Sequence, residues 1–147
     1  MRAAAFVAGL LLSCGCVTAR PSRNTEAEVR AVLDRQVAEW NRGSVDGFMH
    51  GYSNSPDTRF ASGGEVTMGW QTVGERYKRR YSDAAKMGHL DFDHVDVKIL
   101  SPDAAVVFGH WHLHRAADAP TGLFTLVFRR GPDGWRIVHD HTSSATP

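Results

Sequence analysis

The feature of this sequence that most constrains its fold is a change in the spacing of apolar residues near Gly88. Before this glycine, apolar side chains recur every three or four residues, a spacing typical of amphipathic helices. After it, apolar and polar side chains alternate over long runs, which is typical of strands. Helices followed by a run of strands predict an α+β fold, with the helices packed on one face of an antiparallel sheet.

Three helices and several strands are expected from local signals. The first helix follows the capping box Thr25-Glu26-Ala27-Glu28, the second follows Ser44, and the third follows a capping box that starts at Thr72. A hairpin is expected around Gly63-Gly64. Strands are then predicted at residues 89–100, 104–115, 122–130 and 135–143, with turns between them.

The first residues differ in composition from the rest of the chain. Residues 1–13 are predicted to be a secretory signal peptide, because Arg2 precedes an apolar run that is shorter than the roughly 20 residues needed to span a bilayer. The run ends in Leu11-Leu12-Ser13-Cys14, which is similar to a bacterial lipobox. Cys14 is therefore the predicted lipidation site, and Cys16 is the alternative.

Residues 14–24 are predicted to be a tether, and residues 25–144 are predicted to form a single folded domain. Acyl chains on Cys14 would anchor this domain to a bacterial membrane, facing outside the cytoplasm. If the host has two membranes, the outer membrane and the periplasm are expected, because Gly15 is not the aspartate that retains lipoproteins in the inner membrane.

Composition excludes several classes of partner. The chain has 17 Lys and Arg against 16 Asp and Glu, so it lacks the excess positive charge on which nucleic-acid binding relies, and no nucleic acid is expected. Cys14 and Cys16 are the two cysteines of the chain, so disulfides cannot hold the domain together. The sequence has no phosphate-binding glycine loop, nucleophile elbow or zinc-finger spacing, and no cofactor is predicted.

Several short motifs resemble those of one known family, the SnoaL-like domains of the nuclear-transport-factor-2-like superfamily. They are Gly69-Trp70, Glu75-x-Tyr77, Ala105-x-Val107-x-Gly109-x-Trp111 and the run at residues 134–143, GWRIVHDHTS. The resemblance covers residues 25–144. It implies a cone-shaped fold in which a strongly curved sheet wraps around three N-terminal helices, with a pocket in the open end and a dimer through the outer face of the sheet. Because this fold hosts isomerases, cyclases, dehydratases and assembly domains, the resemblance implies no single activity.

Candidate site residues follow from strict alternation in the last strand. Alternation places His139 and His141 on the core side, with Asp140 pointing away. The predicted ligand-contact residues are these two histidines and three aromatic residues near the wide end of the cone, Trp70, Tyr77 and Trp111. If the domain is an enzyme, His141 and His139 are the predicted acid and base, and a purely structural role for both is the alternative. Isomerases of this family carry an aspartate on the first strand, where this chain has Ala61 or Ser62, and this departure weighs against isomerase chemistry.

A second group of histidines, His110, His112 and His114, shares one face of the longest predicted strand. Imidazoles at this spacing can ligate zinc, but no acidic ligand stands at a convincing distance in the sequence, so no metal site is predicted. A histidine ladder that faces solvent or a dimer partner is expected instead. Large apolar residues on both faces of residues 122–130 favour a homodimer through the sheet.

Together these observations predict a membrane-anchored domain that binds a small, largely apolar molecule in a conical pocket. One alternative is an acid/base enzyme of the isomerase, cyclase or dehydratase type. The other is a dimeric interaction module that uses the outer face of the sheet.

Overall fold

The computed structural model describes residues 23–145 of the chain. The predicted signal peptide, the lipidation site Cys14 and most of the tether lie outside these residues. Four helices are present in the described part, α1 (Arg23–Asn41), α2 (Val45–Met49), α3 (Trp70–Arg80) and α4 (Ala84–Met87). The strands are β1 (Arg59–Ser62), β2 (Glu65–Met68), β3 (His89–Ser101), β4 (Ala104–His114), β5 (Thr121–Gly131) and β6 (Gly134–Thr142).

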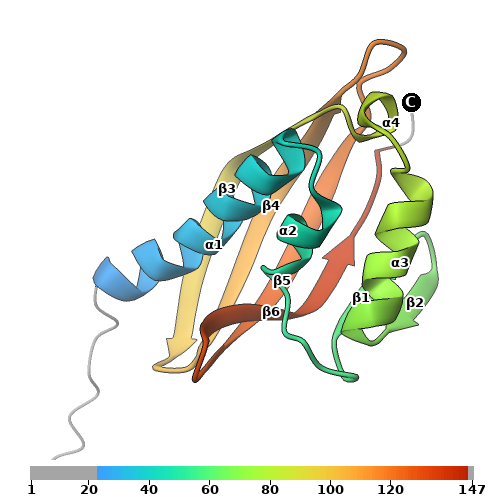
Figure 1. The fold of residues 1–147 in the computed structure, drawn as a ribbon. Helices are drawn as coiled ribbons and strands as arrows, with labels where there is room; N and C mark the ends of the chain where they lie inside the picture. Colours follow the sequence, from blue (N-terminus) through green and yellow to red (C-terminus); the bar gives the residue numbers. More distant parts are fainter. Residues whose placement is uncertain (1–22, 146–147) are drawn as a thin grey trace, which may run out of the picture.

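The predicted α+β cone is confirmed, with the strands forming one curved sheet in the order β2-β1-β6-β5-β4-β3. Figure 1 shows α1 lying along the concave face over β3 and β4, while α3 packs beside the β1–β2 hairpin. The core lies between these layers, where α1 residues such as Val29 and Leu33 are buried together with Val107, Phe128 and Ile137 of the sheet.

Several details of the fold differ from the predictions. Helices α1 and α3 begin at Arg23 and Trp70, each two residues before its predicted capping box at Thr25 or Thr72. The third predicted helix is followed by a fourth, α4, which Asp83 caps by accepting a hydrogen bond from the Lys86 backbone nitrogen at 2.9 Å. The sheet is mixed rather than antiparallel, because β1 pairs with β6 in parallel. The direction of β1 is set just before it begins, where Tyr52 already bridges to Ile137 in parallel. Apolar spacing reports which residues are buried and carries no information on strand direction.

Three β-bulges interrupt the sheet within residues 23–145, at residues 93–96 and 99–101 of β3 and at Val138 of β6, and each reverses the alternation of side chains. In β3 the register with β4 shifts between Asp93 and Asp96. In β6 the register with β5 shifts so that Val127 pairs with His139 and Phe128 pairs with Ile137, which leaves Val138 as the extra residue. Residues beyond each bulge therefore face the side opposite to the one that strict alternation predicts.

None of the helices within residues 23–145 is both long and apolar enough to cross a membrane.

Candidate functional site

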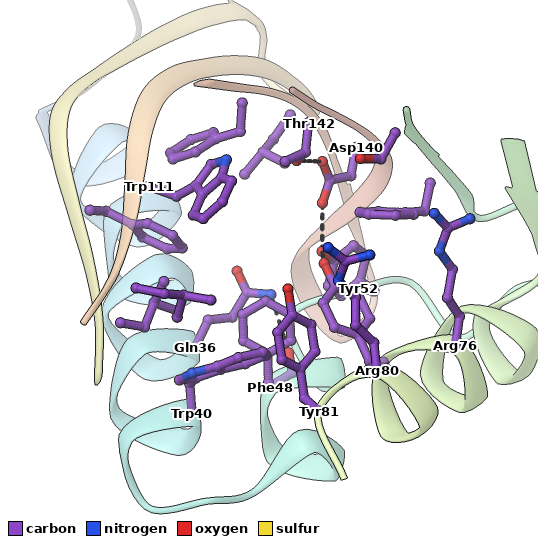
Figure 2. Close-up of a pocket in the computed structure, with 18 of the residues that line it drawn as sticks. Gln36, Trp40, Phe48, Tyr52, Arg76, Arg80, Tyr81, Trp111, Asp140 and Thr142 are labelled. Carbon is purple, nitrogen blue, oxygen red and sulfur yellow. Dashed lines mark hydrogen bonds between the residues drawn. The ribbon is translucent and has the colours of Figure 1, made fainter. Parts of the chain in front are cut away.

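The candidate site is a pocket between the concave face of the sheet and helices α1, α2 and α3 (Figure 2). Its cavity volume is about 120 Å³. Aromatic side chains make up about half of its lining. Five come from helices or loops and four from strands: Trp40, Phe48, Tyr52, Tyr77, Tyr81, Phe60, Phe92, Trp111 and Phe124. A strongly curved sheet cannot bring all its side chains into contact with the helices at its wide end, and the pocket occupies the space that remains.

Trp40 is fixed in the pocket wall by ring contacts and by a hydrogen bond. Trp40 packs edge-on against Phe48 at 5.1 Å and against Tyr81 at 4.7 Å between ring centroids. Its indole nitrogen donates to the carbonyl oxygen of Met87 at 3.1 Å, which connects α1 to α4. Aromatic pairs at such distances and angles add stability beyond burial alone, so this side of the pocket is preformed.

Asp140 is the main polar group of the pocket and is only 3% exposed. Its Oδ2 accepts a hydrogen bond from the Tyr52 hydroxyl at 2.7 Å, and its Oδ1 accepts one from the Thr142 hydroxyl at 2.6 Å (Figure 2). Burial raises the pKa of Asp140 to about 6, although the bonds from Thr142 and Tyr52 and the nearby His141 favour the ionised form. Near neutral pH this carboxyl group can therefore both accept and release a proton.

Two tyrosines extend this network. The hydroxyls of Tyr52 and Tyr77 lie 3.4 Å apart. Burial, followed by the charge of Asp140, raises the pKa of each well above its usual value of 10.0. Both therefore remain phenols at neutral pH and can donate hydrogen bonds.

Gln36 supplies a second polar group at the floor of the pocket and is only 2% exposed. Its amide nitrogen donates to the carbonyl oxygen of Phe48 at 3.1 Å. Its side-chain oxygen makes no hydrogen bond to any residue in the described part of the chain and points into the cavity in Figure 2. Because it faces the cavity without a partner among these residues, this oxygen can accept a hydrogen bond from a donor group that enters the pocket.

Two arginines from α3 stand at the rim. Arg76 donates to Thr67 Oγ1 at 2.8 Å, and its guanidinium lies 5.1 Å from the Phe60 ring centroid. Arg80 lies 5.9 Å from the centre of the Tyr81 ring, and no carboxylate of residues 23–145 forms a salt bridge with it. Arg76 also forms a salt bridge with Glu65 at 3.4 Å, so the uncompensated positive charge at the entrance comes from Arg80.

Of the three aromatic residues predicted to contact a ligand, Tyr77 and Trp111 line the pocket and Trp70 does not. The indole nitrogen of Trp111 donates to the carbonyl oxygen of Ser143 at 3.0 Å. The indole nitrogen of Trp70 instead donates to the carbonyl oxygen of Met49 at 2.9 Å and connects α3 to α2. Trp70 therefore has a structural contact in place of the predicted one.

The predicted orientation of His139 and His141 is wrong. Both lie on the outer face of the sheet, where His141 is exposed and His139 is half-buried, and neither lines the pocket. The cause is the bulge at Val138, which turns Asp140 inward in their place. Partial burial, then the nearby Arg59 and His141, lowers the pKa of His139 below its usual value of 6.5.

Asp140 was missed because its position depends on the bulge. The only local sign is that Ile137 and Val138 are adjacent apolar residues, which breaks the alternation of the strand. The first strand, β1, carries no carboxylate, and its residue Ser62 lines the pocket. The carboxyl group of the pocket comes from the last strand instead.

Comparisons with known proteins agree with this architecture. A family model described as a SnoaL-like domain matches residues 29–147. An NTF-2-like protein of unknown function from Shewanella oneidensis is 37% identical, with a TM-score of 0.76, and the match covers 80% of this chain and 97% of that one. A search of curated proteins found no match.

Two more distant solved structures share the fold. A Nostoc punctiforme protein with a cystatin-like fold is 19% identical with a TM-score of 0.73, covering 86% of this chain and 81% of that one. A ketosteroid isomerase-like protein from Erwinia carotovora is 16% identical with a TM-score of 0.69, covering 86% of this chain and 100% of that one. The family match spans most of the chain, and the chain therefore belongs to the SnoaL-like domains of the nuclear-transport-factor-2-like superfamily.

Proposed function

We propose that this domain binds a small, largely apolar molecule in the aromatic pocket, with one polar group of the ligand directed at Asp140. The observation that carries the proposal is a buried carboxyl group, with a pKa raised to about 6, at the end of a preformed aromatic cavity. Burying a carboxyl group costs stability unless it is fully compensated. A ligand that bonds to Asp140 gives a functional reason for keeping it there.

The pocket sets limits on the ligand. Its volume of about 120 Å³ is somewhat smaller than the roughly 150 Å³ engineered cavity that holds benzene. The part held inside is therefore about the size of one ring or a short branched chain. Gln36 Oε1 can accept a hydrogen bond from a donor group of the ligand, and the Tyr77 hydroxyl can donate one to an oxygen atom of the ligand. A small hydroxylated or carbonyl-bearing ring fits both groups.

The binding proposal is tested with the full-length chain and its Asp140→Asn variant, with the exposed Asp133→Asn as the matched control. We expect native mass spectrometry to detect a small apolar molecule that co-purifies with the parent and with Asp133→Asn. Binding should be lost or weakened in Asp140→Asn and in Gln36→Leu. Equal retention in all four proteins would place the ligand elsewhere, and no retained or stabilising compound from a panel of phenols and cyclic ketones would contradict the proposal.

A second candidate function is proton transfer on such a ligand, and the pKa of Asp140 favours it. A general acid or base works best when its pKa lies near the operating pH. The phenol of Tyr77 could donate to an oxyanion that forms beside the carboxyl group, while the one hydroxyl proton of Tyr52 stays in its hydrogen bond to Asp140. One structural neighbour is described as ketosteroid isomerase-like, which makes isomerase, cyclase and dehydratase substrates the first to test.

The enzymatic candidate assigns the acid/base role to Asp140 instead of His139 and His141. Turnover should therefore disappear in Asp140→Asn, while ligand affinity falls far less. His141→Ala should retain turnover, because its side chain lies on the outer face, although loss of its charge should raise the pKa of Asp140 and shift the pH dependence. If His141→Ala abolished turnover without unfolding the protein, the assignment to Asp140 would be wrong.

We also propose that lipid on Cys14 anchors the domain to a bacterial membrane, facing outside the cytoplasm, and to the outer membrane if the host has two membranes. The support is the lipobox-like run at residues 11–14, which precedes the described residues. Cys14→Ser should move the protein from the membrane fraction to the soluble fraction, while Cys16→Ser should not. Retention of Cys14→Ser in membranes would favour Cys16 or another mode of attachment.

The outer face of the sheet is proposed to bind a second copy of the chain. Phe108 and Leu123 are 41% and 42% exposed and lie on neighbouring strands of this face. Large apolar side chains gathered on a sheet face are typical of protein interfaces.

A further inference from the structure

A cluster of histidines and aspartates lies on the outer face of the sheet, at the β3 edge and away from the pocket. Oδ1 of Asp93 is 2.8 Å from Nδ1 of His94 and 3.6 Å from Nδ1 of His110. One ligand atom from each of these three residues can be chosen so that all lie within 4.8 Å of one another. Asp93 is the acidic partner that sequence spacing did not reveal, because it comes from the neighbouring strand.

The β3 bulge creates this cluster. In a regular strand His94 would face the core, on the side opposite to Asp93. The register shift after Asp93 and a left-handed backbone at His94, with φ 48°, place both residues on the outer face instead. The imidazole of His94 then lies 4.8 Å from that of His110, measured between ring centroids.

His112 orients the carboxylate of Asp93. Its Nε2 lies 3.1 Å from Oδ2 of Asp93, and its Nδ1 lies 3.0 Å from Oγ1 of Thr121. Oδ2 is thus held from one side, while Oδ1 faces His94 and His110. Residues that fix a ligating carboxylate in this way strengthen metal binding.

We propose that Asp93 Oδ1, His94 Nδ1 and His110 Nδ1 form a binding site for a divalent first-row transition metal, with Zn²⁺ as the test ion. Ligands of tetrahedral zinc lie about 2.0–2.1 Å from the metal, and therefore about 3.3 Å from each other. The observed separations of 2.8 Å and 3.6 Å from Asp93 Oδ1 bracket this value. His94 is 73% exposed in its side chain, so its ring can rotate to close the site.

The donor set selects the class of metal. Two imidazoles and a carboxylate suit zinc and its neighbours, whereas Mg²⁺ and Ca²⁺ prefer sites built from oxygen ligands. Three protein ligands leave at least one position for solvent or another ligand.

A second aspartate on the same face provides an internal control. Asp91 also lies between two histidines, with Oδ1 at 3.7 Å from His89 Nε2 and Oδ2 at 3.1 Å from His114 Nε2. Here the two imidazoles approach different oxygens and do not converge on one point. Within residues 23–145, only the Asp93 group brings three ligand atoms within 4.8 Å.

The site is tested by titrating Zn²⁺ into the full-length chain by calorimetry, and Co²⁺ by visible absorption. The protein carries no histidine tag, and Cys14 and Cys16 are replaced by serine because thiolates bind zinc themselves. We expect one Zn²⁺ per chain and no binding of Mg²⁺. Asp93→Asn, His110→Gln and His94→Asn should each weaken Zn²⁺ binding by about tenfold or more. Asparagine is used at position 94 because it tolerates the left-handed backbone.

The controls decide the outcome. Asp91→Asn and His114→Gln should bind Zn²⁺ as the parent does, and the metal-free variants should melt at the parent temperature. Absence of one-site binding in the parent, or an equal loss from Asp91→Asn and Asp93→Asn, would overturn the proposal. The result is independent of the pocket, because none of these residues lines it.

Discussion

Among single residues, Asp140 has the largest effect on how the pocket behaves with pH. Its pKa is raised from 3.8 to about 6, so the folded state binds this proton more tightly than the unfolded state does. The associated stability is fully present below pH 3.8 and is lost as the pH rises through about 6. Each tenfold change in proton affinity is worth about 1.4 kcal/mol, so ionised Asp140 costs the fold about 3 kcal/mol.

The variant Asp140→Asn tests this cost, because asparagine has nearly the same shape and never ionises. Asparagine loses a hydrogen bond at every pH, but it escapes the ionisation cost at high pH. The free energy of unfolding of Asp140→Asn relative to the parent should therefore improve by about 2 kcal/mol between pH 4 and pH 7.5. Denaturant unfolding at both pH values measures this change. A difference that does not vary with pH would show that Asp140 is not desolvated.

The hydrogen bond from the Tyr52 hydroxyl is expected to lower the pKa of Asp140. The hydroxyl donates at 2.7 Å to the carboxyl group and favours the ionised form, so Tyr52→Phe should raise the pKa of Asp140 above about 6. Carboxyl carbon shifts in an NMR titration report this pKa directly. Tyr81→Phe, a pocket residue with no such bond among residues 23–145, should leave it unchanged. A similar shift of the Asp140 pKa in both variants would show that the hydrogen bond from Tyr52 is not its cause.

At the scale of elements, the shape of the pocket wall depends on how closely the chain after β6 approaches β5. Gly122 in β5 illustrates this, because a Cβ atom there would lie against the carbonyl oxygen of Ser143 and 2.8 Å from Trp111 Nε1. Only a glycine lets the chain after β6 pass this close, and that approach also positions Trp111 in the pocket wall.

Gly122→Ala should accordingly destabilise the domain by about 1–3 kcal/mol, the usual cost of overpacking. Gly131→Ala is the matched control at the other end of β5, where a Cβ would meet nothing within 4 Å. Thermal unfolding of both variants measures the difference. Equal stability of the two variants would mean that the Ser143 backbone moves away without cost.

At the scale of the whole molecule, the exposed apolar face of the sheet predicts the state of assembly. Leu123→Asp should convert the proposed dimer into a monomer, because a two-fold interface would bury the new charge from both copies. Sedimentation velocity measures the change. Val66→Asp lies on the edge strand β2, where Val66 is 61% exposed against 42% for Leu123, and it should leave the dimer intact. If the parent protein sediments as a monomer, the proposed homodimer is wrong.

Much of the fold could be predicted because it depends on local patterns. Side-chain periodicity within each element predicts the apolar face of α1 and the strands after Gly88. It also predicts that the histidines of β4 share one face. The family resemblance implies a cone with a wide, aromatic end, which predicts Tyr77 and Trp111 near the pocket, and both line it. The predictions failed where strict alternation was assumed past a bulge, as at His139 and His141.

The sequence by itself determined which segments become helices and strands, since each segment carries its own apolar period. Only the tertiary structure decided the parallel pairing of β1, the inward turn of Asp140 and the meeting of Asp93 with His94 and His110. A bulge forms where one of two paired strands has one more residue than its partner over the same stretch of the sheet. That difference is a property of the pair of strands, and a pattern read along one strand cannot contain it.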